Sequence, residues 1–355
     1  MTDSAFLEVK HLKKYFDLGH DRLLKAVDDV SLNIRKGKTL GIVGESGCGK
    51  TTFGRTVLGI YEKTGGKVVF DGKDTDAMSE KEHFQLKKRM QMIFQDPYAS
   101  LNPRSTVLDL IAEPMDIHHL CKNGRDRRAR VEKLLQEVGL SADFLNRYPH
   151  EFSGGQRQRI GIARALALNP EFVIADEPIS ALDVSVQAQV VQLLKQLQKE
   201  KGLTMMFIAH DLSMVKYISD DVAVMYLGHL VEQTSSRVLY DRPLHPYTQA
   251  LLSAIPIPDP DVEEKRKRII LSGDLPSPIN PPSGCVFRTR CPLAMAACAS
   301  EKPSLKEVAE GHYVACHLHP SAKSGHAARM KQVFNKEENR PFQSIFPYLN
   351  HALYF

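Results

Sequence analysis

The fold of this chain is decided by the stretch Gly44-Glu45-Ser46-Gly47-Cys48-Gly49-Lys50-Thr51. It matches the pattern G-x-x-x-x-G-K-[ST], which forms a loop around the phosphates of a nucleotide. Residues 40–43 are an apolar run and residues 52–58 are expected to form a helix, so the stretch lies between a strand and a helix, as the motif requires. The sequence therefore predicts an α/β protein with a nucleotide site at this loop.

The residue types of the loop suit the binding of phosphates. Glycines let backbone N–H groups turn toward phosphate oxygens, and the following helix adds the positive end of its dipole. Lys50 is expected to reach the β- and γ-phosphates, and the Thr51 hydroxyl is expected to bind Mg²⁺. Thr52 is expected to complete the nucleotide contacts, whereas Cys48 occupies a variable position and receives no special chemistry.

Length and composition predict a cytosolic globular protein. The chain has 355 residues, 43% of them hydrophobic, and a net charge of +5, which suits an anionic ligand or a membrane face. We expect no nucleic-acid partner. No run of about 18 apolar residues is present, and the N-terminus lacks a signal-peptide pattern. In the cytosol, the six cysteines favour free thiols or metal ligands over disulfides.

Two further apolar runs end in residues suited to phosphate chemistry. Residues 172–175 precede Asp176 and Glu177, at the kind of strand end where α/β sheets bind ligands. Asp176 suits an acid that holds Mg²⁺ through water, and Glu177 suits a general base, although paired acids also occur in solvated turns. His210 ends the next run, 204–209, where it is either structural or placed to contact the γ-phosphate.

Two other positions each allow two interpretations. Ser153 is a natural N-cap, and Gly154 and Gly155 leave the first N–H groups of the predicted helix open. This helix end therefore either binds an anion or is simply capped. Tyr15 lies just before a predicted loop, where it either stacks on adenine or packs in the core.

The chain is expected to divide into three parts. Residues 5–240 would form the nucleotide-binding domain, with a helical subdomain at about 96–165. Proline becomes frequent after about residue 237, which predicts a C-terminal extension over 241–320. The tail, 321–355, has few periodic apolar residues and receives no role.

The order of these motifs, with Gln95 and the Ser-Ala-Leu-Asp run at 180–183, resembles the ATP-binding subunits of ABC transporters over residues 5–255. The resemblance implies a P-loop NTPase core with an antiparallel β subdomain and a helical subdomain. It also implies that two such domains pair head to tail around ATP, each phosphate loop facing the signature of the partner. The signature residues here are Ser153, Gly154, Gly155 and Gln156.

The resemblance also implies a role for the remaining site residues. Tyr15 would stack on adenine, with Phe16 as a possible substitute. Gln95 would sense and help to bind Mg²⁺ and would link the site to a membrane subunit. Asp183 would communicate across the dimer, and His210 would steady the γ-phosphate. The catalytic residues of this ATP hydrolase would be Glu177, His210 and Lys50.

A closer resemblance is to the peptide and nickel importer branch of the same superfamily. It rests on residues 94–103 (FQDPYASLNP), 177–185 (EPISALDVS) and 243–248 (PLHPYT). It implies the second ATPase of a dipeptide or oligopeptide importer, peripheral on the cytoplasmic face of the membrane. Its partners would be a second ATPase in a heterodimer, two transmembrane permease subunits and, indirectly, an extracytoplasmic peptide-binding protein.

Three alternatives to peptide import stay open. The solute could be nickel or another small molecule, because the ATPase does not touch the cargo. A soluble ABC ATPase without a channel would lack membrane subunits. A nucleic-acid-handling ABC ATPase would need two signatures in one chain or a strongly basic insert, and one signature is visible here.

The extension carries four cysteines with the spacing C-x5-C-x6-C-x17-C, namely Cys285, Cys291, Cys298 and Cys316. Four thiolates suit zinc or an iron–sulfur cluster, and unligated thiols or a mixed set with nearby histidines are further alternatives. The resemblance to peptide importers favours a [4Fe–4S] cluster with a structural or regulatory role.

Overall fold

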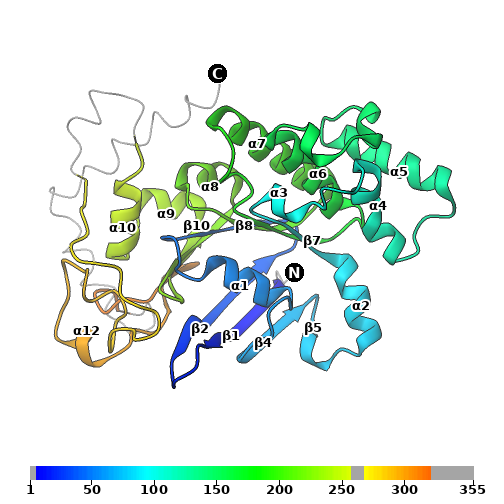
Figure 1. The fold of residues 1–355 in the computed structure, drawn as a ribbon. Helices are drawn as coiled ribbons and strands as arrows, with labels where there is room; N and C mark the ends of the chain where they lie inside the picture. The colour runs from blue at the N-terminus through cyan, green and yellow to red at the C-terminus, as the bar shows by residue number, and fades with distance from the viewer. Residues whose placement is uncertain (1–4, 257–267, 321–355) are drawn as a thin grey trace.

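The computed structural model describes residues 5–256 and 268–320. Its centre is an eight-stranded mixed sheet, on which a four-stranded antiparallel sheet and several helices pack (Figure 1). The predicted α/β fold is thereby confirmed. The tail at 321–355 lies outside the described residues.

The large sheet has the strand order β11-β12-β10-β9-β3-β8-β7-β6. Its parallel strands are β3 (Thr39–Val43), β6 (Met90–Ile93), β7 (Phe172–Asp176), β8 (Thr204–Ile208) and β9 (Asp221–Tyr226). Antiparallel pairing adds β10 (His229–Ser235), β11 (Lys306–Ala309) and β12 (His312–Val314). Every residue of β3, β7 and β8 is buried, which explains why these strands are continuous apolar runs in the sequence.

The small sheet covers one face of the large sheet. Its order is β2-β1-β4-β5, formed by β1 (Ala5–Asp17), β2 (Leu23–Arg35), β4 (Gly65–Phe70) and β5 (Lys73–Asp74). Helix α1 (Lys50–Val57) lies between the two sheets, where Phe53 is fully buried in the same apolar cluster as side chains of both. Because α1 follows the phosphate loop directly, this packing fixes the end of the loop.

Helices cover the opposite face of the large sheet, and further helices form a helical subdomain beside it. The helices that contribute buried side chains there include α6 (Gly154–Leu166), α7 (Val184–Lys201), α8 (Leu212–Ile218) and α9 (Ser236–Asp241). The helical subdomain adds α3 (Pro97–Ser100), α4 (Val107–Ile117) and α5 (Gly124–Glu137), and α2 (Glu80–Arg89) precedes β6. Short 3-10 helices occupy Thr75–Ala77, Ala142–Asn146 and Pro149–Glu151. Gly139 follows Val138, the C-cap residue of α5, with a φ of 72°, the left-handed conformation that glycine commonly adopts after a helix.

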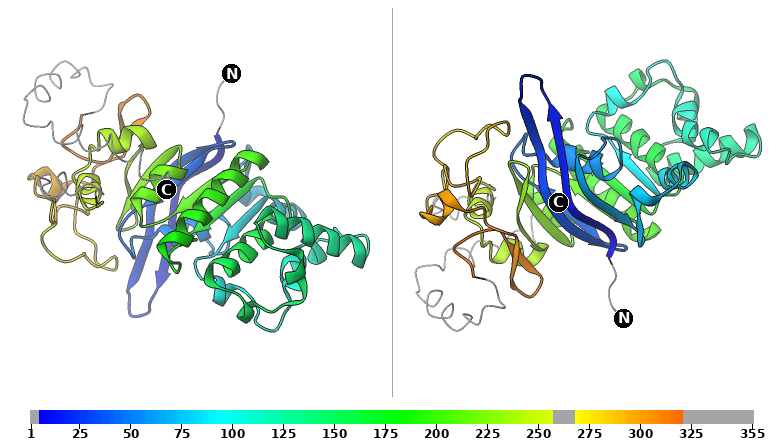
Figure 2. Two further views of the ribbon diagram at one scale, coloured as in Figure 1. Left: turned by 90° about the horizontal axis from the view of Figure 1, so that it is seen from above. Right: turned by 90° about the horizontal axis from the view of Figure 1, so that it is seen from below.

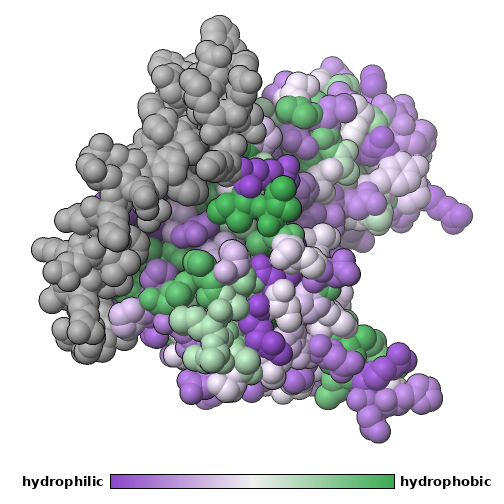
Figure 3. Space-filling model, turned by 90° about the vertical axis from the view of Figure 1, so that its left-hand side faces the viewer, coloured by the Kyte–Doolittle hydropathy of each residue, from purple (hydrophilic) through white to green (hydrophobic). Residues whose placement is uncertain are grey.

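The C-terminal extension lies at the end of the molecule opposite the helical subdomain (Figure 2). It contains α10 (Pro246–Ser253), α12 (Ala297–Ser300) and the strands β11 and β12. Strand β12 pairs with β10, so the extension continues the large sheet. On this side of the molecule hydrophilic and hydrophobic residues are interspersed (Figure 3), while Val286 and Phe287 are buried.

A buried carboxylate fastens the extension to the sheet. Glu232 of β10 is fully buried and accepts hydrogen bonds from the backbone N–H groups of Leu244 at 2.8 Å and His245 at 3.0 Å. His312 Nε2 lies 2.7 Å from the same side chain. A buried carboxylate is tolerated only when its oxygens are satisfied in this way.

Among the described residues, none of the helices has the length and apolar character of a membrane span.

Candidate nucleotide-binding and hydrolysis site

Two close backbone approaches hold the phosphate loop between β3 and α1. Gly44 has a φ of 152°, and a Cβ there would lie 2.2 Å from the Met225 carbonyl oxygen. Gly49 has a φ of 103°, and a Cβ there would lie 2.1 Å from the Ala26 carbonyl oxygen. No side chain fits such gaps, so these two positions of the motif require glycine.

The buried ammonium group of Lys50 is oriented by the loop itself. Lys50 Nζ donates to the carbonyl oxygens of Gly44 at 2.8 Å and Glu45 at 3.1 Å. The loop lines a cavity of about 270 Å³ together with side chains and backbone from distant elements. The lining residues are Phe16, Leu24, Lys25, Ala26, Ser46, Gly47, Gly49, Lys50, Thr51, Thr52, Gln95, Glu177, Gly228 and Pro278.

Asp176 lies beside the Thr51 hydroxyl at the end of β7. The Thr51 Oγ1 donates to Asp176 Oδ1 at 2.7 Å, and Arg55 Nη2 lies 3.8 Å from Oδ2. The carboxylate is fully buried, and among the described residues its Oδ2 accepts no hydrogen bond. Burial raises the pKa of Asp176, against the opposing effects of Thr51 and Arg55. A hydroxyl and an unsatisfied carboxylate oxygen form a donor set that suits Mg²⁺.

Two other predicted site residues, Gln95 and His210, lie near one carboxylate oxygen of Glu177. Gln95 Nε2 donates to Glu177 Oε2 at 2.8 Å, and His210 Nδ1 lies 3.9 Å from the same oxygen. Glu177 itself has a φ of 42°, which is unusual for a residue with a side chain, and its N–H donates to the Ile208 carbonyl oxygen at 2.9 Å. Such strain at a buried strand end is typical of functional positions.

The predicted signature caps α6 and lies apart from the cavity. The Ser153 side chain accepts from the Gln156 N–H, and the Gln156 side chain accepts from the Ser153 N–H, which confirms the predicted cap. Gly155 packs against α7, where a Cβ would lie 2.4 Å from Val186 Cγ1. Asp183 is the N-cap residue of α7. As far as the described residues go, the lining of the Lys50 cavity includes none of these residues.

Phe16, and not Tyr15, contributes to the described lining of the cavity. The two residues are neighbours on β1, so their side chains point to opposite faces of the small sheet. The Tyr15 hydroxyl donates to Asp28 Oδ1 at 2.5 Å, and burial, together with this bond, raises the pKa of Tyr15. We therefore propose Phe16, which the resemblance gives as a possible substitute for Tyr15, as the aromatic residue that faces a bound base.

The comparisons with known proteins agree with this geometry. A family profile described as "ABC transporter" matches residues 27–180, and one described as "Oligopeptide/dipeptide transporter, C-terminal region" matches residues 231–298. The putative oligopeptide transport ATP-binding protein YkfD of Bacillus subtilis is 63% identical over 329 residues, covering 93% of this chain and 100% of that protein. The chain belongs to the ABC-type oligopeptide transport ATP-binding proteins.

A second relative and a solved structure also match this chain. The oligopeptide transport ATP-binding protein OppF of Salmonella typhimurium is 56% identical over 320 residues, covering 88% of this chain and 96% of that protein. The solved dimer of the ATP-binding cassette MJ0796 with ADP and phosphate is 30% identical, with a TM-score of 0.60 over 65% of this chain and 99% of that one. The chain is therefore an ATP hydrolase of the ABC type, a class for which ATP and Mg²⁺ are expected.

The four cysteines of the ABC ATPase extension lie near one another. Burial, together with the neighbouring Cys285, Cys291 and Cys298, raises the pKa of the Cys316 thiol to about 11. Despite this proximity, no group of three or more Cys, His, Asp or Glu side chains in the described residues is arranged to hold a metal ion. The predicted metal site is therefore not supported by the side-chain geometry.

The placement of Phe16 gives a test of adenine stacking. Phe16→Leu should weaken ATP binding about ten-fold, because aromatic stacking on a base contributes roughly 1–3 kcal/mol. The matched variant Tyr15→Leu removes an aromatic ring of similar size from the other face of β1 and should change the affinity less than about two-fold. Titration of the full chain with a fluorescent ATP analogue measures both. The reverse pattern would restore Tyr15 as the stacking residue.

Proposed function

We propose that this ABC ATPase powers the import of dipeptides or oligopeptides across the cytoplasmic membrane, as one of two ATPase subunits on its inner face. The observation that carries the proposal is the match of the chain, over nearly its whole length, to oligopeptide transport ATP-binding proteins, with the C-terminal region included. Lys50, Thr51 and Glu177 line one cavity and Asp176 bonds to Thr51 beside it, which supports an active motor subunit.

In this proposal, one chain supplies half of each ATP site. Lys50 and Thr51 would bind the phosphates and Mg²⁺ in one chain, and residues 153–156 of a second ATPase would close the site from the other side. This division is supported by the separation of the α6 signature from the described lining of the cavity. It is also supported by the first turn of α6. Ser153 caps the Gln156 N–H there, and the N–H groups of Gly154 and Gly155 suit an anion. Asp183, at the start of α7, would lie near the dimer contact.

The catalytic roles follow from what each group can do chemically. Glu177 would accept a proton from the attacking water, and Gln95, which donates to the Glu177 carboxylate, would orient the base and the water. His210, near the same carboxylate, would steady the γ-phosphate as charge develops. Asp176 and Thr51 would hold Mg²⁺, which supplies charge neutralisation on the phosphates when bound.

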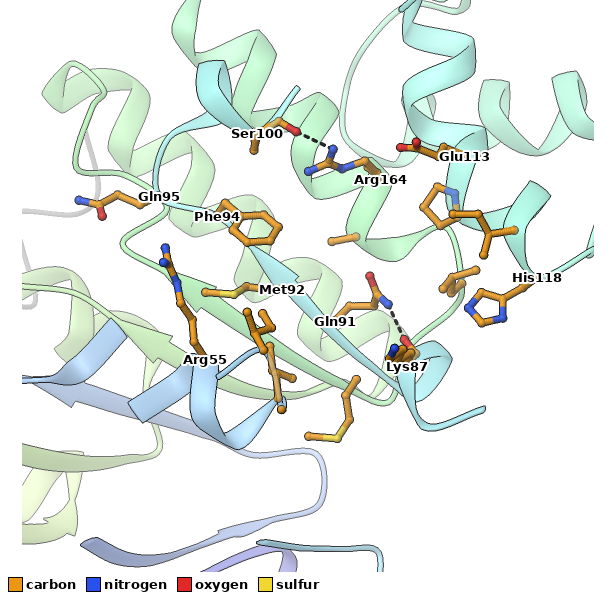
Figure 4. Close-up of a pocket in the computed structure, with 18 of the residues that line it drawn as sticks. Arg55, Lys87, Gln91, Met92, Phe94, Gln95, Ser100, Glu113, His118 and Arg164 are labelled. Atoms are coloured by element: carbon orange, nitrogen blue, oxygen red, sulfur yellow. Dashed lines mark hydrogen bonds between the residues drawn. The ribbon is translucent and has the colours of Figure 1, made fainter. Parts of the chain in front are cut away.

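Gln95 also lines a second, larger cavity. This groove, of about 950 Å³, lies between the β6 edge of the sheet, α1 and the helices of the helical subdomain (Figure 4). Its walls include Phe94 and Met92 and the charged side chains Arg55 and Glu113. We propose that a transmembrane permease subunit docks in this groove, because Gln95 then connects the docked segment directly with the nucleotide cavity.

Glu177→Gln tests the assignment of the general base. The substitution keeps the shape of the side chain but removes the proton acceptor, so hydrolysis should fall at least about 100-fold while ATP binding persists. ATP-bound dimers should accumulate, which size-exclusion chromatography of the purified ATPase pair detects. Steady-state hydrolysis close to the wild-type rate in the assembled complex would exclude Glu177 as the base.

Peptide uptake tests the proposed function itself. In a strain that depends on an external dipeptide or oligopeptide for an essential amino acid, Lys50→Ala should abolish growth on the peptide, while growth on the free amino acid stays normal. Uptake of labelled peptide and of labelled nickel, measured in the same strain, separates the two candidate cargoes. Loss of nickel uptake with normal peptide uptake would contradict peptide import.

For the cysteines, we propose that Cys285, Cys291, Cys298 and Cys316 bind a [4Fe–4S] cluster with a structural or regulatory role, with zinc as the alternative. The proposal is supported by the spacing of the four cysteines, by the burial of Cys285, Cys298 and Cys316, and by the Cys285 N–H, which donates to the Cys298 carbonyl oxygen at 2.8 Å. The described side chains would have to move to ligate a metal together.

Metal analysis decides between the two metals. Protein purified without oxygen should contain about four iron and four acid-labile sulfide per chain, with a broad absorption in the visible range. Cys298→Ser should lower the iron content, whereas Cys121→Ser, outside the extension, should not. One equivalent of zinc without sulfide, or no metal at all, would contradict the iron–sulfur proposal.

A further inference from the structure

The extension contacts the phosphate loop through the side chain of Glu45. Arg290 Nη1 donates to Glu45 Oε2 at 2.7 Å, and Arg290 Nη2 donates to Oε1 at 3.1 Å. Two parallel bonds between a guanidinium and a carboxylate fix the direction of the pair as well as its distance. The Arg290 side chain is 10% exposed and that of Glu45 is 28% exposed, so salt screens the pair less than an ordinary surface pair.

The backbone N–H of Glu45 is bound by a second residue from beyond the ATPase core. It donates to Tyr247 Oη of α10 at 2.8 Å. Tyr247 is fully buried, and its ring centroid lies 4.7 Å from that of Tyr226 and 5.4 Å from that of Phe287. The aromatic packing leaves the hydroxyl little freedom, so Tyr247 holds the backbone of Glu45 at a defined position.

The carbonyl group of Glu45 is in turn one of two carbonyl acceptors for Lys50 Nζ. All three polar parts of Glu45 are therefore engaged. The Glu45 side chain is bound by Arg290 and its N–H by Tyr247. Its carbonyl oxygen orients Lys50, the lysine that binds the phosphates. A displacement of Glu45 would move an acceptor of Lys50 directly, without any change in the rest of the loop.

We propose that Arg290 and Tyr247 are positioning residues for ATP, which act through Glu45 to hold the phosphate loop and Lys50 in the arrangement that binds the β- and γ-phosphates. Neither residue lines the described part of the cavity, so neither is expected to contact the nucleotide. The proposal concerns the nucleotide site alone and does not depend on which solute is transported. It gives the extension an effect on ATP binding within its own chain.

The first test removes the guanidinium. Arg290→Ala should raise the Kd for ATP of the full chain about ten-fold, or about 1.4 kcal/mol, because Glu45 loses its charge-assisted bidentate partner. In the assembled complex the KM for ATP should rise similarly, while kcat stays within about two-fold. Arg288→Ala is the matched control, since Arg288 bonds to Ser283 within the extension, and it should leave both constants unchanged.

The second test asks whether the effect passes through Glu45. In a Glu45→Ala background, Arg290→Ala should cause no further loss of ATP affinity, because its partner is already absent. Tyr247→Phe keeps the aromatic packing and removes only the hydroxyl, so it should weaken ATP binding several-fold with little change in Tm. If Arg290→Ala does not fold, Tyr247→Phe decides.

Two outcomes would overturn the proposal. One is ATP affinity unchanged in folded Arg290→Ala and Tyr247→Phe variants. The other is a full additional loss from Arg290→Ala in the Glu45→Ala background. Because these titrations use the ATPase chain and need no peptide, a failure of peptide uptake would leave their interpretation intact.

Discussion

The register of three parallel strands determines where the site residues of this ATPase lie. Ile42 of β3 pairs with Ile208 of β8, and Ile208 pairs with Asp176 of β7. The residues that follow each strand therefore leave the sheet at the same edge, where ligands bind in α/β sheets. This register brings the phosphate loop, Glu177 and His210 together from segments far apart in the sequence. It also buries Asp176 with one oxygen unsatisfied, which is unfavourable for folding but suits a metal ligand.

The fold around these strands could be predicted from the sequence because its signals are local. The apolar runs of β3, β7 and β8 are fully buried strands, and the motif between β3 and α1 has the glycines that its close backbone approaches require. The cap at Ser153 is likewise confirmed, since an N-cap depends on residues within one turn. In each case the side chain and the constraint that selects it lie within a few positions of each other.

The sequence alone does not decide whether Tyr15 or Phe16 faces the nucleotide cavity. Both residues have aromatic rings, and the sequence does not show which side of β1 faces the phosphate loop. That depends on the pairing of β1 with β2, which contains several register shifts, one of them between Lys14 and Tyr15. A shift of one residue exchanges the two faces of a strand. The contact between Glu45 and Arg290 is harder still to predict, because the residues are separated by 245 positions.

The extension is part of the same packed structure as the ATPase core and is not a separate appended domain. Its strand β12 continues the large sheet through β10, its Tyr247 and Arg290 bind Glu45, and its Pro278 lines the nucleotide cavity. The segment that carries Arg290 also carries Cys285 and Cys291, and the Cys285 N–H donates to the Cys298 carbonyl oxygen at 2.8 Å. Any change in the state of these thiols that moves this segment would therefore act on Arg290, and also on Phe287, which packs against Tyr247. Arg290 and Lys50 both bind Glu45. Glu45 is therefore the residue of the phosphate loop that links the cysteine segment, through Arg290, with Lys50.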